Sequence, residues 1–193
     1  MRRDSGERAS LELIQPIVLV GGKSTRFGRD KLREPIGSSG SPLVLRSIEL
    51  LRSVFGRRVK VVGECHPDVQ ALADGVIVDD HPGIGPIGGI ASALRHTRGA
   101  IFVLAGDMPA FSASSARALL AAEREHPRAL AILAATSRAH PCAGVYRHGA
   151  LNQLAACIAR GHYRLSGAVA PRDVIEVACD EASLANVNEP REL

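Results

Sequence analysis

The sequence predicts an α/β protein, a three-layer sandwich in which helices cover a mainly parallel (mixed) sheet. Short apolar runs, typical of buried strands, alternate along the chain with longer amphipathic segments of helical spacing. Turns rich in glycine and proline separate the two kinds of segment. Because strands that are joined through helices pair in parallel, this alternation indicates a sheet with helices on both faces.

Strands are expected where apolar residues run together. The segment 100–107, "AIFVLAGD", is the most apolar, so we expect it to be a central strand. The other strands are predicted at residues 17–20, 59–63, 76–78, 129–135, 142–147 and 174–178.

Longer segments with apolar residues at helical spacing predict the helices. They lie at residues 41–56, from about Pro86 onward, at 112–126 and at 150–160. In the first helix Ser41 is the expected N-cap, Pro42 stands in the first turn and Gly56 ends the helix. Ser112 or Ser114 would cap the helix at 112–126.

The composition favours one globular domain. The chain has 193 residues, and we expect a flexible tail at 1–15 followed by a single domain at 16–193. Aromatic residues are only 3%, which disfavours base-stacking platforms of the RNA-binding kind. The net charge of +4 suits anionic small ligands as well as nucleic acid and decides nothing alone. The four cysteines form no C-x-x-C pair, and no signal peptide or membrane span is expected, so a cytoplasmic location is the default.

The glycine-rich stretch "IVLVGGKSTRFGRDK", residues 17–31, matches neither common phosphate loop. A P-loop would need a further glycine where Ile17 stands, and the dinucleotide fingerprint fails because Gly21 and Gly22 are adjacent. The stretch is either an ordinary turn with solvated basic residues or a polyphosphate site. We favour the second, because backbone N–H groups at the two glycines can approach an anion, and Arg26 and Lys31 would screen its charge.

Two acidic positions follow expected strands. Asp107 ends the most apolar run, where a carboxylate is well placed to hold Mg²⁺ beside phosphate oxygens or to serve only as a helix cap. Asp79 and Asp80 precede a glycine- and proline-rich loop and could accept hydrogen bonds from a guanine edge or ribose, or form a turn.

Polar residues near the end of the chain are further candidates. His140, before Pro141, is more often structural than catalytic in such a position. Asn186 and Asn188 would point the same way on an extended segment and make either a polar binding edge or a turn.

These segments, taken in order, resemble the molybdenum cofactor guanylyltransferases, the MobA family. "LVGGKSTRFGRDK" is similar to the signature L-A-G-G-x-S-x-R-M-G-x-D-K of that family. The later segments "DDHPGIGPIGGI", "LAGDMP", "HPCAGVY" and "NVNEPREL" resemble its remaining motifs in the same order. The likeness covers almost the whole chain, from about Pro16 to Leu193.

The resemblance implies a Rossmann-like nucleotidyltransferase fold and a Mg²⁺-assisted reaction. GMP would pass from GTP to the terminal phosphate of Mo-molybdopterin, giving the guanine dinucleotide cofactor and pyrophosphate. It also implies possible transient contact with molybdoenzymes or other cofactor-synthesis proteins. The chain would then be an enzyme that needs no covalent intermediate, because the attacking phosphate is already an anion.

Together with the basic residues of the first loop, the resemblance implies three groups of site residues. Lys31, Asp107 and Arg26 are the candidate catalytic residues, and Asp107 is also the candidate metal ligand. Asn186 and Asn188 would lie on the pterin side. The candidate nucleotide-binding residues are Leu19, Val20, Gly21, Gly22, Lys31, Asp79 and Asp107.

The chain departs from the family pattern at one nucleotide contact. Gly63 stands where the family usually has Asn, so either Glu64 or a backbone group takes over that contact. Phe27 replaces a Met, Glu189 stands in place of a Thr, and the turn before the first helix is longer than usual.

Three other functions are alternatives to guanylyl transfer. The related cytidylyltransferases resemble L-A-A-G at the first loop, and Gly22 in place of that second Ala favours GTP. A sugar-1-phosphate nucleotidyltransferase would need a larger sugar-binding region. A non-catalytic cofactor carrier or chaperone is disfavoured because Lys31 and Asp107 are both present.

Overall fold

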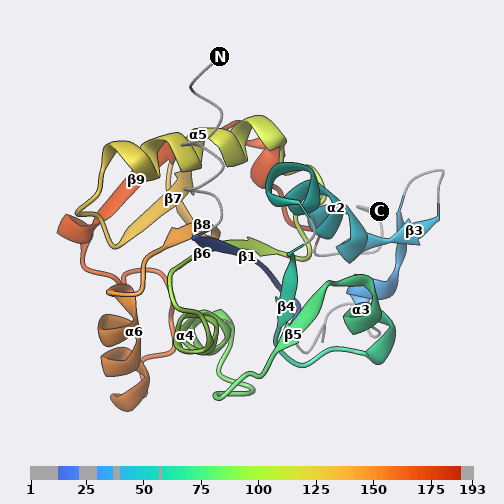
Figure 1. The fold of residues 1–193 in the computed structure, drawn as a ribbon, viewed down its shortest axis with the longest axis horizontal. Coiled ribbons are helices and arrows are strands. Elements are labelled where there is room, and N and C mark those ends of the chain that lie inside the picture. Colours follow the sequence, from blue (N-terminus) through green and yellow to red (C-terminus); the bar gives the residue numbers. More distant parts are fainter. Residues whose placement is uncertain (1–12, 22–29, 37–39, 57, 188–193) are drawn as a thin grey trace.

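The computed structural model describes residues 13–21, 30–36, 40–56 and 58–187. A seven-stranded sheet forms its centre, with the strand order β5-β4-β1-β6-β8-β7-β9 (Figure 1). The strands are β1 (Ile14–Leu19), β4 (Lys60–Val62), β5 (Gly75–Ile77), β6 (Ala100–Ala105), β7 (Ala131–Ala135), β8 (Ala139–Tyr146) and β9 (Val174–Ala178).

The sheet is mainly parallel, and β8 is the exception. It runs antiparallel to both of its neighbours, β6 and β7, whereas the other pairings are parallel. A short turn joins β7 to β8, and such a turn can connect only antiparallel strands. The predicted mixed, mainly parallel sheet is therefore confirmed.

Helices cover both faces of the sheet and complete three layers. In Figure 1, α2 (Leu43–Phe55) and α5 (Ala113–Glu125) lie on one side, and α4 (Pro86–His96) and α6 (Ala150–Ala159) lie on the other. A shorter helix, α3 (Pro67–Leu72), connects β4 to β5. No helix of the described residues is long and apolar enough to cross a membrane.

The side chains of strand β6 contribute alternately to the hydrophobic clusters on the two faces of the sheet. Phe102 and Leu104 belong to the cluster under α2 and α5, whereas Ile101 and Val103 belong to the cluster under α4 and α6. All four side chains are fully buried. Successive side chains of a strand point to opposite faces, so a continuous apolar run is what a strand between two helix layers requires. The prediction of a central strand here is confirmed, but β6 ends at Ala105, so Gly106 and Asp107 already belong to the turn that follows.

Several boundaries differ from the prediction. The strand β1 begins at Ile14, so Ile14 and Gln15 belong to the sheet and not to the tail expected at 1–15. Ile14 is buried and pairs with Ala100 of β6. Pro16 is tolerated because β4 pairs with β1 only from Ile17 onward, which leaves one strand neighbour at this position.

The expected N-cap of the helix at 41–56 is wrong. Ser41 and Pro42 form strand β3, which pairs antiparallel with β2 (Pro35–Ile36), and Pro42 is the residue before the helix without a side-chain cap. Instead, the N–H of Leu43 donates to the carbonyl of Glu34 at 2.8 Å. The cap at Ser112 is confirmed, since its hydroxyl accepts a hydrogen bond from the N–H of Ser115 at 3.0 Å.

Arg147 fastens the end of β8 to the end of α5. Its guanidinium donates to Glu123 Oε1 at 3.0 Å and to the carbonyl of His126 at 3.0 Å. Both charged side chains are largely buried, with 20% and 13% exposed. Removing one partner of such a pair leaves the other charge and helix-end carbonyls unsatisfied.

We therefore expect Arg147→Met to lower the free energy of unfolding by about 3 kcal/mol, because Glu123 loses its partner. Urea denaturation measures the loss. Arg33→Met is the matched control, because Arg33 pairs with Asp68 at 2.9 Å with both side chains exposed, and it should cost less than about 1 kcal/mol. Equal losses in the two variants would contradict the interpretation.

Candidate active site

The residues predicted to carry chemistry gather at one edge of the sheet. Parallel strands share a direction, so the residues that follow β1, β4, β5 and β6 meet at their common carboxyl edge. Gly21 follows β1, Gly63 follows β4, Asp79 follows β5 and Asp107 follows β6. The antiparallel β8 begins at this edge and brings His140 there. The structure therefore places five loops from distant parts of the sequence around one region.

A short, largely buried ion pair at this edge joins Lys31 to Asp107. Lys31 Nζ lies 2.6 Å from Asp107 Oδ2, and the side chains are only 18% and 16% exposed. Lys31 begins a one-turn 3₁₀ helix, Lys31–Arg33, which Asp30 caps by accepting a hydrogen bond from the N–H of Leu32. The buried Leu32 anchors this turn against the core, and so fixes where Lys31 leaves the backbone.

Asp107 owes its position to the glycine before it. The N–H of Gly106 donates to the carbonyl of Leu19 at 3.0 Å, which extends the β1–β6 pairing by one residue. A Cβ at position 106 would lie 3.2 Å from this carbonyl oxygen and equally close to side chains of Leu32 and Val44. These distances are shorter than an ordinary van der Waals contact. A glycine at this position therefore lets the 3₁₀ turn at Lys31–Arg33, the helix α2 and the end of β6 pack together beside Asp107.

The same pair holds the segment that precedes Asn188. Lys31 Nζ donates to the carbonyl of Val187 at 3.1 Å, and the N–H of Val187 donates to the carbonyl of Asp107 at 2.9 Å. Val187 is itself buried, and packs with Leu43. The predicted phosphate lysine, the predicted metal carboxylate and the predicted pterin segment are thus physically joined.

Gly21 and Gly63 are in close contact where two loops cross. Gly63 has a φ of +114°, and a Cβ there would lie 2.6 Å from the nitrogen and 2.9 Å from the Cα of Gly21. The N–H of Val20 donates to the carbonyl of Val62 at 3.0 Å just before this crossing. A side chain at position 63 would therefore collide with Gly21, so this backbone conformation does not accommodate the usual Asn. Glu64 is exposed.

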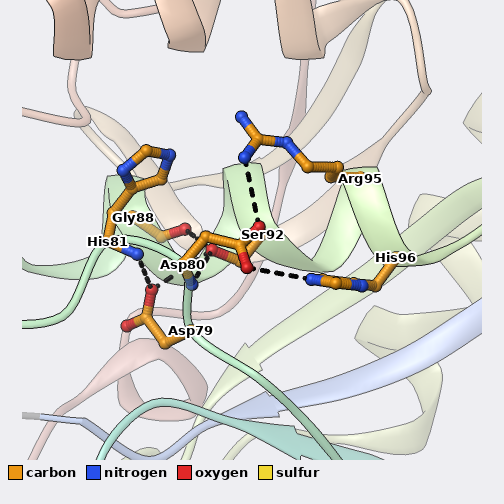
Figure 2. A network of polar contacts seen from close by, with 7 residues as sticks. All are labelled: Asp79, Asp80, His81, Gly88, Ser92, Arg95 and His96. Carbon is orange, nitrogen blue, oxygen red and sulfur yellow. Dashed lines mark hydrogen bonds and ion pairs between the residues drawn. The ribbon is translucent and has the colours of Figure 1, made fainter.

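The two adjacent aspartates have different partners (Figure 2). Asp80 pairs with Arg95 at 3.2 Å and with His96 at 3.0 Å in the last turn of α4. The hydrogen bond from His96 is the main cause that lowers the pKa of Asp80, and the charges of both partners add to it. Asp79 Oδ1 accepts hydrogen bonds from the N–H of His81 at 2.9 Å and from Ser92 at 3.2 Å. Asp80 thus anchors the loop to the last turn of α4, while Asp79 bonds to Ser92 in the middle of α4 and follows the end of β5.

The start of β8 supplies neutral groups to this region. Desolvation and the charge of Arg138 lower the pKa of His140, whose Nε2 lies 3.3 Å from the hydroxyl of Thr136. Burial raises the pKa of Cys142 to about 12, with a smaller contribution from the negative charge of Asp107. The Cys142 thiol therefore stays protonated and presents no second charge to the carboxylate.

Comparison with known proteins identifies the family. The model of the family described as "MobA-like NTP transferase domain" matches residues 16–177. The chain belongs to the MobA-like NTP transferases. It is 32% identical to a probable molybdenum cofactor guanylyltransferase of Chloroflexus aggregans, with 94% of this chain and 92% of that protein covered. A probable molybdenum cofactor guanylyltransferase of Aquifex aeolicus is 31% identical, with 86% and 80% covered.

A solved structure supports the same family. The structure of molybdopterin-guanine dinucleotide biosynthesis protein A from Archaeoglobus fulgidus superposes on this one with a TM-score of 0.71. The two sequences are 26% identical, and the match covers 93% of this chain and 94% of that protein's chain. The expected Rossmann-like nucleotidyltransferase fold is confirmed, and so is the expectation that the chain is an enzyme of this class.

The carboxylate of Asp107 is a group at this edge that could bind a metal ion. The described residues contain no cluster of three His, Cys, Asp or Glu side chains that could hold an ion alone. Asp107 is a partly exposed carboxylate that is already paired with a cation, the ammonium of Lys31. Mg²⁺ is usually held by one or two carboxylates together with substrate phosphates and water. The carboxylate of Asp107 would therefore fit a magnesium ion that arrives with a nucleotide at this MobA-like site.

Some predicted residues cannot be placed and others were not predicted. Gly22, Arg26 and Asn188 lie outside the described residues. Sequence reasoning missed the backbone of Val187, Cys142 and Ser92 as parts of the site. Val187 contributes only backbone groups, and Cys142 and Ser92 lie inside apolar elements, so no local pattern singled them out.

The crossing of the two loops gives a test of the fold at this site. We expect Gly63→Ala to lower the free energy of unfolding by more than about 3 kcal/mol, because both the positive φ and the collision with Gly21 must be relieved. Gly161→Ala is the control, since Gly161 has a φ of +74° but open space around it. It should lose only about 1 kcal/mol in thermal or urea unfolding. Similar losses would show that the collision is unimportant.

Proposed function

We propose that this MobA-like enzyme transfers GMP from GTP to the terminal phosphate of Mo-molybdopterin. The products would be the molybdopterin guanine dinucleotide cofactor and pyrophosphate. The relatives named as guanylyltransferases support this assignment. The observation that carries it is the Lys31–Asp107 pair at the carboxyl edge of the sheet, which is also bonded to Val187.

The chemistry needs alignment and charge neutralisation. An oxygen of the acceptor phosphate attacks the α-phosphorus of GTP, and the bond from that phosphorus to the bridging oxygen of the β-phosphate breaks. The electron pair leaves with pyrophosphate. No general base is needed, because the attacking oxygen is already anionic. The protein's share is therefore to hold two anions in line and to offset their repulsion.

Lys31 is suited to this task because its ammonium retains donor capacity. An ammonium has three N–H donors, and the structure uses two of them, on Asp107 Oδ2 and on the carbonyl of Val187. The remaining donor can reach a phosphate oxygen while the lysine stays in place. Gly21 is exposed and offers a further backbone N–H. We propose that Leu19, Val20 and Gly22 also lie against the nucleotide and that Arg26 is a further cation.

Asp107 would hold Mg²⁺ together with the phosphates of the nucleotide, and the ion would neutralise their charge. Asp79 would contact the guanosine part from the end of β5. Asn186 and Asn188 would bind the pterin, since Val187 between them is fastened to the catalytic pair. We expect the reaction to take place in the cytoplasm, with possible transient transfer of the product to molybdoenzymes.

The proposal is tested by Asp107→Asn, which keeps the size of the side chain but removes its charge. We expect pyrophosphate release from GTP and Mo-molybdopterin to fall at least about 100-fold, because charge stabilisation of this kind is usually worth that much. Circular dichroism should show an unchanged fold. Asp68→Asn, at an exposed carboxylate outside the site, should react normally. Near-normal turnover by Asp107→Asn would refute the metal role.

The choice of nucleobase needs its own experiment, because the rival product is the cytosine form of the same cofactor. With equal GTP and CTP in one reaction, we expect mass spectrometry of the product to show at least about tenfold more guanine than cytosine dinucleotide. Pocket differences of this kind are worth about 1–3 kcal/mol. Equal amounts of the two products would remove the GTP assignment and leave nucleotidyl transfer itself intact.

A further inference from the structure

Ser92 is a polar residue in the middle of an apolar, buried helix. It lies on α4 between Ala91 and Ala93, and all three side chains have 0% of their surface exposed. An alanine at this position would have a higher helix propensity and would bury no polar atom. The hydroxyl must therefore be satisfied by specific partners, and these partners indicate what it does.

The Ser92 hydroxyl lies where the loop after β5 comes closest to α4. A Cβ at Gly88, one turn earlier, would lie 2.6 Å from the carbonyl oxygen of His81, so only a glycine allows this approach. Ser92 Oγ accepts a hydrogen bond from the N–H of Asp80 at 2.9 Å. It lies 2.8 Å from the carbonyl of Gly88 and 3.2 Å from Asp79 Oδ1, and can donate its single proton to either of them.

These contacts fix one oxygen of Asp79 and leave the other for a ligand. Oδ1 is engaged by Ser92 and by the N–H of His81, as the dashed lines of Figure 2 show. The same view shows the second oxygen turned away from both donors, and no described residue donates to it. Asp79 is partly exposed at the end of β5, on the same edge as Gly21 and Gly63.

We propose that Ser92 is a positioning residue, which holds the Asp79 carboxylate in the orientation that accepts hydrogen bonds from the nucleoside part of GTP. This inference rests on the proposed function, in which Asp79 contacts that part of the substrate. Ser92 does not touch the nucleotide in this arrangement. Its effect on GTP binding should therefore depend on the presence of Asp79. If the hydroxyl only stabilised the loop, its effect would be the same with and without Asp79.

A double-mutant cycle separates the two roles. Calorimetry would measure the dissociation constant of GTP with Mg²⁺ for the unchanged protein, Ser92→Ala, Asp79→Ala and the double variant. We expect Ser92→Ala to weaken GTP binding about tenfold, because hydrogen bonds to a charged group are among the stronger ones. In the Asp79→Ala background the same change should weaken binding less than about twofold, since the carboxylate that it orients is gone.

Two further variants keep the experiment interpretable. Ser115→Ala removes a hydroxyl from α5, where Ser115 contacts Ser112 and lies outside the site, and it should leave GTP binding unchanged. Ser92→Cys keeps the shape of the side chain but is a weaker acceptor. If Ser92→Ala does not fold, Ser92→Cys carries the test, with a loss of about threefold expected.

The outcomes distinguish failure of this inference from failure of the proposed function. Equal effects of Ser92→Ala in both backgrounds, or no effect in the unchanged protein, would overturn the positioning role. An unchanged GTP dissociation constant in Asp79→Ala would instead show that Asp79 does not contact the nucleotide. Weaker binding in both single variants, with no further loss in the double variant, would support the inference.

Discussion

The pairing of β1 with β6 is the constraint on which the rest of the site depends. The two strands are in register along their whole length, from Ile14 with Ala100 to Leu19 with Ala105, and the bond from Gly106 to Leu19 adds one more step. This register brings the loop after β1 and Asp107 to the same height at the edge of the sheet. Because β1 and β6 end at the same level of the sheet, Lys31 can approach Asp107 to 2.6 Å.

The acidic residues of the site show how burial and partners divide similar side chains among different tasks. Asp80 is committed to Arg95 and His96, and its lowered pKa keeps it charged as an anchor of the loop. Asp107 is held by a cation in a position where a phosphate-bound metal also fits. In Asp79, Oδ1 accepts hydrogen bonds from His81 and Ser92, and the other carboxylate oxygen has no donor among the described residues. Only the last two remain suitable for a ligand.

Much of this architecture could be predicted from the sequence because local signals carried it. The alternating strands and helices, the central position of 100–107 and the cap at Ser112 follow from residue patterns within a few positions. The parts that could not be predicted depend on long-range contacts. Ser41 joins a short ribbon because Leu43 bonds to Glu34, and α3 is only one or two turns long with Val69 as its single buried residue. The collision that excludes a side chain at Gly63 depends on Gly21, 42 positions earlier in the numbering.

The bond from Lys31 to Val187 has a consequence for biosynthesis of the protein. Residue 31 leaves the ribosome early, and Asp107 follows much later, but Val187 comes after the last strand of the sheet. Domains fold as units while translation proceeds. The strands can therefore assemble on the nascent chain, whereas the Lys31 ammonium gains its backbone partner Val187 only after the last strand, β9, has been made. A nascent chain that ends between β9 and Val187 would already contain every strand of the sheet and still lack the hydrogen bond from Lys31 to Val187.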